Sequence, residues 1–247
     1  MSPDSAPVFW LTARQFLEGR SIRIVAILAA VPLLLGLIEI IASGRDIAIR
    51  SALGGGFIEL SIPTILPLIA LILASTAIGN EISDRTLIYL ILKPWGRMRL
   101  IQEKFLATVA VGALIAAVFS FLVWLMLGIV GSDLDGELML AMIVACVLAV
   151  AAYGAAFTLL SLVITRVLMA GLLYVLIWES LLARFIPGLR LLSIRHYVQS
   201  IYASMLNDGG ITVAQQSTLS TSLIVLAVFI PICIVLSWLR LQQMDLD

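Results

Sequence analysis

Long apolar stretches alternate with short polar segments along most of this chain. Six of them approach the roughly 20 residues that a helix needs to cross a bilayer; they cover residues 24–43, 57–79, 105–130, 138–164, 167–186 and 221–239. Lipid offers no partner to backbone N–H and C=O groups, so each stretch is expected to form a helix. The pattern therefore predicts an all-α integral membrane protein with six transmembrane helices, in a single transmembrane domain over residues 1–247.

Prolines interrupt several of these stretches and predict kinks. They are Pro32 in the first stretch, Pro63 and Pro67 in the second, and Pro231 in the sixth. Two interpretations stay open: static packing kinks, or kinked helices that line a path and change shape. We find no internal repeat, which argues against a secondary transporter built from inverted repeats.

Composition places nearly the whole chain in or close to a membrane. Hydrophobic residues make up 62% and charged residues 12%, with a mean hydropathy of +1.15, whereas a soluble domain carries roughly 25% charged residues. The 247 residues leave no room for a soluble catalytic domain. The net charge is zero, so no nucleic-acid partner is suggested.

The few residues with metal-binding or redox chemistry are expected to be structural. Cys146 and Cys233 lie inside apolar stretches, where small buried thiols are favoured over a disulfide or a metal site. His196 is the single histidine and is expected on a helix surface; without an acidic cluster it argues against a zinc site. The N-terminal residues lack a basic start followed by an apolar stretch, so no signal peptide is predicted.

The distribution of Lys and Arg predicts the orientation. With the N-terminus in the cytoplasm, ten of the fifteen basic residues fall on the cytoplasmic side and five on the outer side. Cytoplasmic loops are enriched in Lys and Arg. We therefore expect a multi-pass protein of the bacterial inner (plasma) membrane with both termini in the cytoplasm.

The most informative polar segment is residues 80–104, between the second and third stretches. It holds five of the basic residues, including both lysines. Apolar residues at 87–92 predict a short helix that Pro94 ends, with a turn at Gly96. Acids at one end and bases at the other predict a helix that inserts into the cleft of a soluble partner. The alternative is an interfacial loop whose arginines, with Lys104, lie at the inner headgroup level.

A second amphipathic segment, residues 5–22, precedes the first stretch. Pro7 suits a first helical turn. Apolar side chains gather on one face, and Arg14 lies on the other; the apolar face comprises Phe9, Trp10, Ala13, Phe16 and Leu17. This pattern predicts a helix in the plane of the inner leaflet. It serves as an anchor, and a role in contacting a cytoplasmic partner stays open.

The segment 187–220, between the fifth and sixth stretches, contains apolar residues at helical spacing over a length too short to cross a bilayer. We expect short interfacial or re-entrant helices on the outer side. Glu179, just before it, is the most deeply placed acid, and intramembrane carboxylates are functional candidates by default. A structural ion pair with Arg184 or a neighbouring span is one interpretation; contact with substrate or gating is the other.

The segment that begins at Glu81 resembles the signature after the second span in ABC-2 type permeases, the membrane subunits of ATP-binding-cassette exporters. That signature has an acid, a Thr–Leu pair, a basic–Pro step, an Arg and a Lys that opens the third span. The corresponding residues here are Glu81, Asp84, Thr86, Leu87, Tyr89, Lys93, Pro94, Arg97 and Lys104. Many members have Gly before the Thr, where this chain has Arg85.

The resemblance implies a transport subunit that works with a separate ATPase. The helix near residues 81–92 would be the coupling helix, seated in a cleft of the ATPase. The complex would hold two permease subunits, identical or different, and two ATPase subunits that carry the ATP and Mg. Independently of the resemblance, the chain contains no GxxxxGK[ST] phosphate loop, so it is not expected to be an enzyme and needs no cofactor of its own.

The predicted function is a permease subunit that couples ATP hydrolysis by its partner to export of an unidentified, amphipathic or lipid-like substrate. Three alternatives remain open: lipid movement, mechanical work on an extracytoplasmic partner, and, less favoured, an ATP-independent secondary transporter or channel. A membrane enzyme is disfavoured because the stretches contain no His/Asp cluster, paired aspartates or GxSxG serine.

Overall fold

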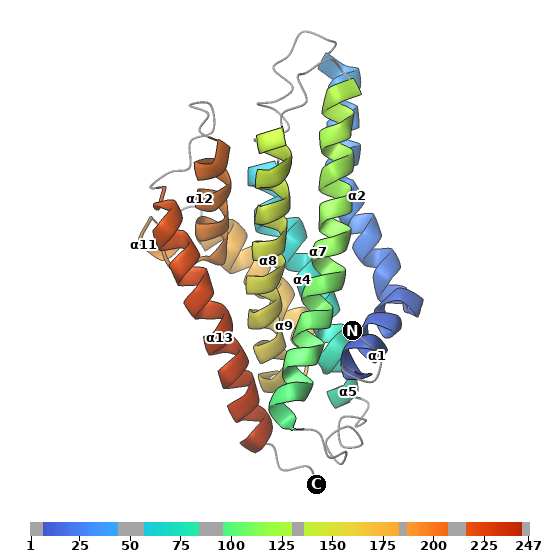
Figure 1. Ribbon diagram of the computed structural model, residues 1–247, viewed down its shortest axis with the longest axis vertical. Coiled ribbons are helices and arrows are strands. Elements are labelled where there is room, and N and C mark those ends of the chain that lie inside the picture. Colours follow the sequence, from blue (N-terminus) through green and yellow to red (C-terminus); the bar gives the residue numbers. More distant parts are fainter. Residues whose placement is uncertain are drawn as a thin grey trace.

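The computed structural model describes residues 7–43, 57–83, 96–129, 136–182, 187–206 and 216–243, and every regular element among them is a helix (Figure 1). The all-α membrane fold is thereby confirmed. The elements are α1 (Pro7–Glu18), α2 (Arg20–Ser43), η2 (Phe57–Ile65), α4 (Leu66–Ala74), η3 (Ser75–Gly79), α5 (Asn80–Ser83), α7 (Arg97–Ile129), α8 (Gly136–Val163), α9 (Val167–Leu173), η4 (Tyr174–Leu182), α11 (Pro187–Arg190), α12 (Ile194–Leu206) and α13 (Leu219–Gln243).

Among the described residues, five helical runs are long and apolar enough to cross a membrane: those within α2, η2–α4–η3, α7, α8 and α13. The second is one continuous run in which two π-helical segments flank α4. Where the fifth stretch was predicted, α9 continues into π-helical η4, and the apolar helix Val167–Glu179 is shorter than the others. The number of six transmembrane helices therefore stays a prediction.

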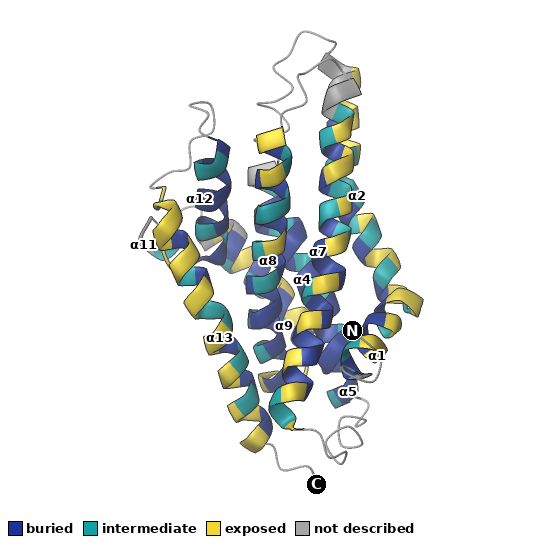
Figure 2. Ribbon diagram, viewed as in Figure 1, coloured by how far each residue is buried: buried dark blue, intermediate teal, exposed yellow. Residues whose placement is uncertain are grey.

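Helix α8 lies at the centre of the bundle and packs against α7, α4, α13 and α12. Of the five, the second run is the most enclosed (Figure 2). In its most apolar 18 residues 78% are buried, compared with 17% in the corresponding stretch of α13. Large apolar side chains on α2 and α13 are exposed, among them Ile38 and Ile224. Such a surface suits contact with lipid acyl chains rather than water.

The bundle has two distinct ends (Figure 1). At one end, called the α1 end, lie α1, α5, the start of α7 and the C-terminal end of α13. Helix α12 lies toward the opposite end, where it packs on α8, α13 and η2. Its 13 residues are too few to cross a bilayer.

Close helix packing depends on small residues at the contacts, as is usual between membrane helices. A Cβ atom at Gly171 of α9 would lie 2.2 Å from Cδ1 of Leu71 on α4. At Gly112 of α7 it would lie 2.9 Å from Cγ1 of Val150 on α8. Glycine thus sets the separation of both helix pairs.

Gly171→Ala is predicted to destabilise the bundle, because the added methyl group overlaps Leu71. Overpacking of this kind costs about 1–3 kcal/mol. The measurement is the thermal unfolding midpoint of the purified chain in detergent. The matched control is Gly136→Ala, where a Cβ atom meets nothing within 4 Å. Equal midpoints for the two variants would contradict this account of the α4–α9 contact.

Candidate functional site: the junction at the start of α7

The first two turns of α7 carry a group of charged side chains that we call the α7 junction: Arg97, Arg99, Glu103 and Lys104 with their partners. α7 begins at Arg97, inside the polar segment 80–104 singled out in the sequence. Three of the four side chains bind different elements of the bundle. The junction therefore connects that segment to the rest of the molecule.

Lys104 joins α7 to the end of the second helical run. Its Nζ lies 2.6 Å from Oε1 of Glu81 and donates a 2.5 Å hydrogen bond to the carbonyl oxygen of Ala77. Lys104 is fully buried and Glu81 is 7% exposed. Lys104 is thus enclosed by protein, and its predicted depth at the headgroup level stays a prediction. The carboxylate and the carbonyl of a π-helical turn take the place of water around its ammonium group.

This pair is costly to break from one side. Removing one partner of a buried ion pair leaves an unpaired buried charge, at a cost of about 3–5 kcal/mol. Glu81 belongs to α5, which continues from η3 without a break. The pair therefore holds the end of the second run in register with the start of the α7 helix.

Glu103 joins α7 to α1. Its Oε2 accepts hydrogen bonds from the backbone N–H groups of Val8 at 2.9 Å and Phe9 at 3.1 Å, and its Oε1 accepts one from Nε of Arg99 at 2.7 Å. The first N–H groups of a helix have no partner within the helix, and that end carries a partial positive charge. Glu103 thus caps a helix that lies 95 positions earlier in the chain.

Arg97 joins α7 to α13. Its Nη1 donates to the backbone carbonyl oxygens of Gln242 at 3.2 Å and Leu241 at 3.4 Å. These carbonyls belong to the last turn of α13, where helical acceptors lack donors and the dipole favours a cation. At the start of α7, the Glu103 carboxylate therefore binds the positive N-terminal end of α1, and the Arg97 guanidinium binds the negative C-terminal end of α13.

The apolar face of α1 divides into a buried and an exposed part. Phe16 is fully buried and Ala13 nearly so, in the cluster that includes Leu100 and Ile101 of α7. Trp10 is 50% exposed and Leu17 63%. Arg14 forms an exposed ion pair with Glu18, Nε to Oε1 2.7 Å. α1 thus packs on the bundle while its remaining apolar side chains face outward.

The structure brings two of the predicted coupling residues, Glu81 and Arg97, to the ends of the same junction. The others lie outside the described residues and stay predictions: Asp84, Arg85, Thr86, Tyr89, Lys93 and Pro94. Sequence reasoning missed Glu103. Its spacing from Arg99 was a visible signal for a helical ion pair, but nothing in the sequence pointed to the distant amides of α1.

A second polar cluster surrounds Glu179, which is fully buried. Its carboxylate accepts hydrogen bonds from the hydroxyl groups of Tyr174, at 3.0 Å, and Ser193. Arg195 donates from Nη1 to the backbone carbonyl of Glu179 at 3.3 Å. The contacts with Ser193 and Arg195 fasten η4 to the start of α12, whereas the bond between Tyr174 and Glu179 lies within η4. Arg184, the predicted partner of Glu179, lies outside the described residues.

His196 is buried, with 1% exposure, so the expectation of a helix-surface position is wrong. α12 packs between α8 and α13, and Nε2 of His196 lies 2.9 Å from Oγ of Ser217 just before α13. Burial, with the positive charge of Arg190 second, lowers the pKa of His196. The imidazole is therefore neutral at pH 7.

Both clusters join separate helical elements through ion pairs and hydrogen bonds. The described residues include no group of His, Cys, Asp and Glu side chains that could hold a metal ion. Both cysteines are buried thiols. When one helix moves, ion pairs and helix caps of this kind move its partner with it, because they are short and directional. Removing one partner leaves a buried polar or charged group unpaired, which costs free energy.

Glu103→Gln is predicted to loosen α1, because a neutral amide oxygen is a weaker cap than a carboxylate and the ion pair with Arg99 is lost. A cap and its dipole interaction are worth about 1–2 kcal/mol. We expect amide hydrogen exchange at Val8 and Phe9 to accelerate roughly five- to thirty-fold. Glu18→Gln, which changes an exposed carboxylate of α1, is the control. Unchanged exchange in Glu103→Gln would contradict the capping role.

Ser193→Ala is predicted to lower stability by about 1–3 kcal/mol, because it removes a hydrogen-bond donor from a buried carboxylate. The readout is the unfolding midpoint in detergent, with Leu192→Ala as the exposed neighbouring control. Tyr174→Phe should also lower stability, because it removes the hydrogen bond to the other carboxylate oxygen of Glu179. Midpoints like that of the unmodified chain in both variants would show that the cluster does not fasten η4 to α12.

The chain is similar to a known family of membrane proteins. No curated protein gave a significant match to the chain. A family model described as "ABC-2 family transporter protein" matches residues 37–246, which include the α7 junction and the Glu179 cluster. This multi-pass membrane chain therefore belongs to the ABC-2 family of transporter proteins, membrane components that act with an ABC ATPase subunit.

Proposed function

We propose that this chain is the membrane-spanning permease subunit of an ABC exporter, and that residues 80–96 receive the movement of a separate ATPase subunit. One observation carries the proposal. The segment ends at the first turns of α7, and those turns are bonded to the second helical run, to α1 and to α13. A force on residues 80–96 is therefore passed through the start of α7 to the second helical run, to α1 and to α13.

Both ends of the segment are fastened. Glu81, at its start, pairs with Lys104, and Arg97, at its end, binds the last turn of α13. A partner that displaces the segment therefore moves α5 and α7 together rather than sliding one past the other. α7 then continues unbroken for 33 residues and packs along α8, so the displacement reaches the far end of the bundle.

The proposed assembly has two permease subunits, identical or different, and two ATPase subunits that bind ATP and Mg. The α1 end faces the cytoplasm, with both termini on that side of the inner (plasma) membrane. The basic residues of the junction support this orientation, as does the mixed character of α1, with Trp10 exposed beside the Arg14–Glu18 pair.

The cargo is unidentified, and the apolar interior of the bundle favours an amphipathic or lipid-like molecule. Lipid movement, or work on a partner outside the cytoplasm, would use the same junction and the same ATPase. An ATP-independent transporter or channel would not need it. Purified alone, the chain is expected to be inert and to recover activity only with its ATPase.

Glu81→Ala is predicted to uncouple the complex, because Lys104 loses the carboxylate that ties α5 to α7. The full chain is co-expressed with its ATPase, and a dye is placed on α7 at Leu125→Cys in a Cys146→Ser, Cys233→Ser background. In the parent complex, ATP with vanadate should change the dye fluorescence. In Glu81→Ala the ATPase should still co-purify, while that change falls at least several-fold.

Glu18→Ala, at an exposed carboxylate, is the control and should respond like the parent. The exchanged pair Glu81→Lys with Lys104→Glu should recover part of the response, since it restores the ion pair in reverse. A parental fluorescence change in Glu81→Ala would contradict the proposed coupling route. Failure of the ATPase to co-purify even with the parent chain would contradict the assembly itself.

A further inference from the structure

A pocket lies between α2, the second helical run, α7 and α8 and is partly open to its surroundings. It is lined by Ala29, Pro32, Ser61, Ile65, Leu66, Ile69, Ala116, Phe119, Ser120, Val123, Met142 and Cys146. None of these side chains is charged. The pocket shares no residue with the α7 junction or with the Glu179 cluster.

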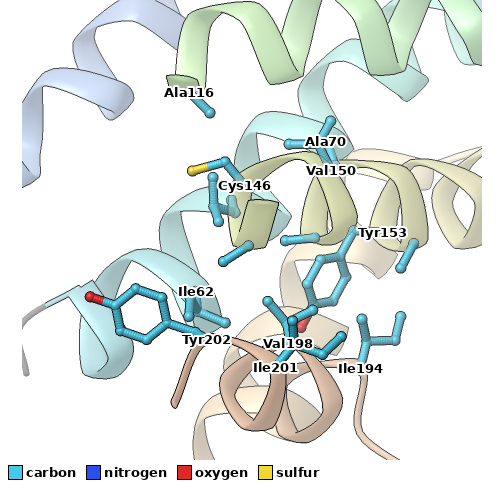
Figure 3. Close-up of a cluster of buried hydrophobic side chains, with 14 of the residues drawn as sticks. Ile62, Ala70, Ala116, Cys146, Val150, Tyr153, Ile194, Val198, Ile201 and Tyr202 are labelled. Carbon is cyan, nitrogen blue, oxygen red and sulfur yellow. The ribbon is translucent and has the colours of Figure 1, made fainter. Parts of the chain in front are cut away.

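Prolines and small side chains occur on the helices that surround the pocket. Pro32 lies within α2, and Pro63 lies within the π-helical η2 that contributes Ser61. Ala29 and Ala116 present small side chains, and in Figure 3 Ala116 of α7 is drawn on the helix next to Cys146 of α8. Irregular helices with small residues therefore separate α2 from α8 at this level.

Ser61 is the unusual residue of the pocket. Its side chain is 3% exposed, and Oγ has no hydrogen-bond partner among the described residues. Several other helical hydroxyls bond to a backbone carbonyl one turn earlier, as in Ser75 to Ile72 and Ser161 to Phe157, whereas Thr12 and Ser21, which do not line the pocket, also have no partner among the described residues. A buried hydroxyl without a partner costs about 1–3 kcal/mol, which a bound hydrogen-bonding group would recover.

Two further groups add weak polarity. Oγ of Ser120 lies 3.2 Å from Sγ of Cys146, and a thiol is a poor hydrogen-bond partner. The pocket thus offers a few neutral hydrogen-bonding atoms in an apolar lining and nothing to balance a charge.

The surroundings point to entry from the bilayer. Pro32 and Phe119 are half-buried members of the lining, and Leu35 on α2 and Leu122 on α7 are exposed beside them. Both helices belong to candidate membrane spans. A molecule that reaches the pocket between them therefore comes from lipid and leaves any charged headgroup outside.

We propose that this pocket binds a neutral, lipid-soluble molecule with one hydroxyl or carbonyl group, which pairs with Ser61 while the apolar remainder fills the space beside Ala116 and Met142. The site lies within one subunit and does not depend on the proposed coupling to an ATPase. A plain hydrocarbon would leave Ser61 unpaired, and a charged amphiphile would bury an uncompensated charge.

The full chain in lipid nanodiscs tests this with a pair of photoreactive probes: a long-chain alcohol that carries a diazirine, and the diazirine alkane of matched length. Labelled peptides are identified by mass spectrometry. We expect the alcohol to label the lining residues of the second run, α7 and α8. Ser61→Ala should reduce this labelling about three- to ten-fold, as for loss of one hydrogen bond.

Ser75→Ala is the matched control, since Ser75 is buried in the same run but bonds to Ile72 and does not line the pocket. Ser61→Thr keeps the hydroxyl and should retain labelling. Ala116→Leu fills the space and should abolish it. Equal labelling of the lining by the alkane, unchanged labelling in Ser61→Ala, or labelling confined to exposed apolar residues such as Leu34 and Ile38 would each overturn the proposal.

Discussion

The arrangement of this protein depends on Lys104, the one Lys or Arg side chain that is buried among the described residues. Nothing in an apolar bundle solvates an ammonium group except what the fold brings to it. Here Lys104 receives the carboxylate of Glu81 and the carbonyl of Ala77. Both groups belong to the end of one helical run, and the lysine belongs to the start of another. The charge therefore fixes the two helices against each other where the connecting segment leaves and re-enters the bundle.

Around this pair, the start of α7 uses the two ends of helix dipoles as attachment points. Glu103 satisfies the amides of α1, and Arg97 satisfies the carbonyls of α13. Both contacts use groups that every helix leaves unpaired, so they need little from the sequences of α1 and α13. This explains how one helix start is tied to three parts of the bundle.

Much of the fold could be predicted from the sequence, because lipid forces apolar stretches to be helical. The positions of α2, α7, α8 and α13 follow from hydrophobic length alone, and Pro7 indicated where α1 begins. The π-helical segments could not be predicted, since hydropathy does not distinguish i+4 from i+5 hydrogen bonding. The burial of Lys104 was missed for a related reason: a basic residue at the end of a span is ordinarily placed in the headgroups, and only tertiary packing supplies Glu81. The cap by Glu103 and the position of His196 are also long-range, so no local pattern contains them.

The central claim is that a cytoplasmic ATPase contacts the segment between Glu81 and Arg97. The most direct measurement places a photoreactive amino acid at Arg85 or Tyr89 in the full chain, co-expressed with its ATPase, and identifies what is crosslinked in intact cells. The account predicts a crosslink to the ATPase from these positions and none from Leu192 toward the opposite end of the bundle. Reaction of a cysteine at Arg85 with a membrane-impermeant reagent added outside the cell, without any crosslink to the ATPase, would contradict it.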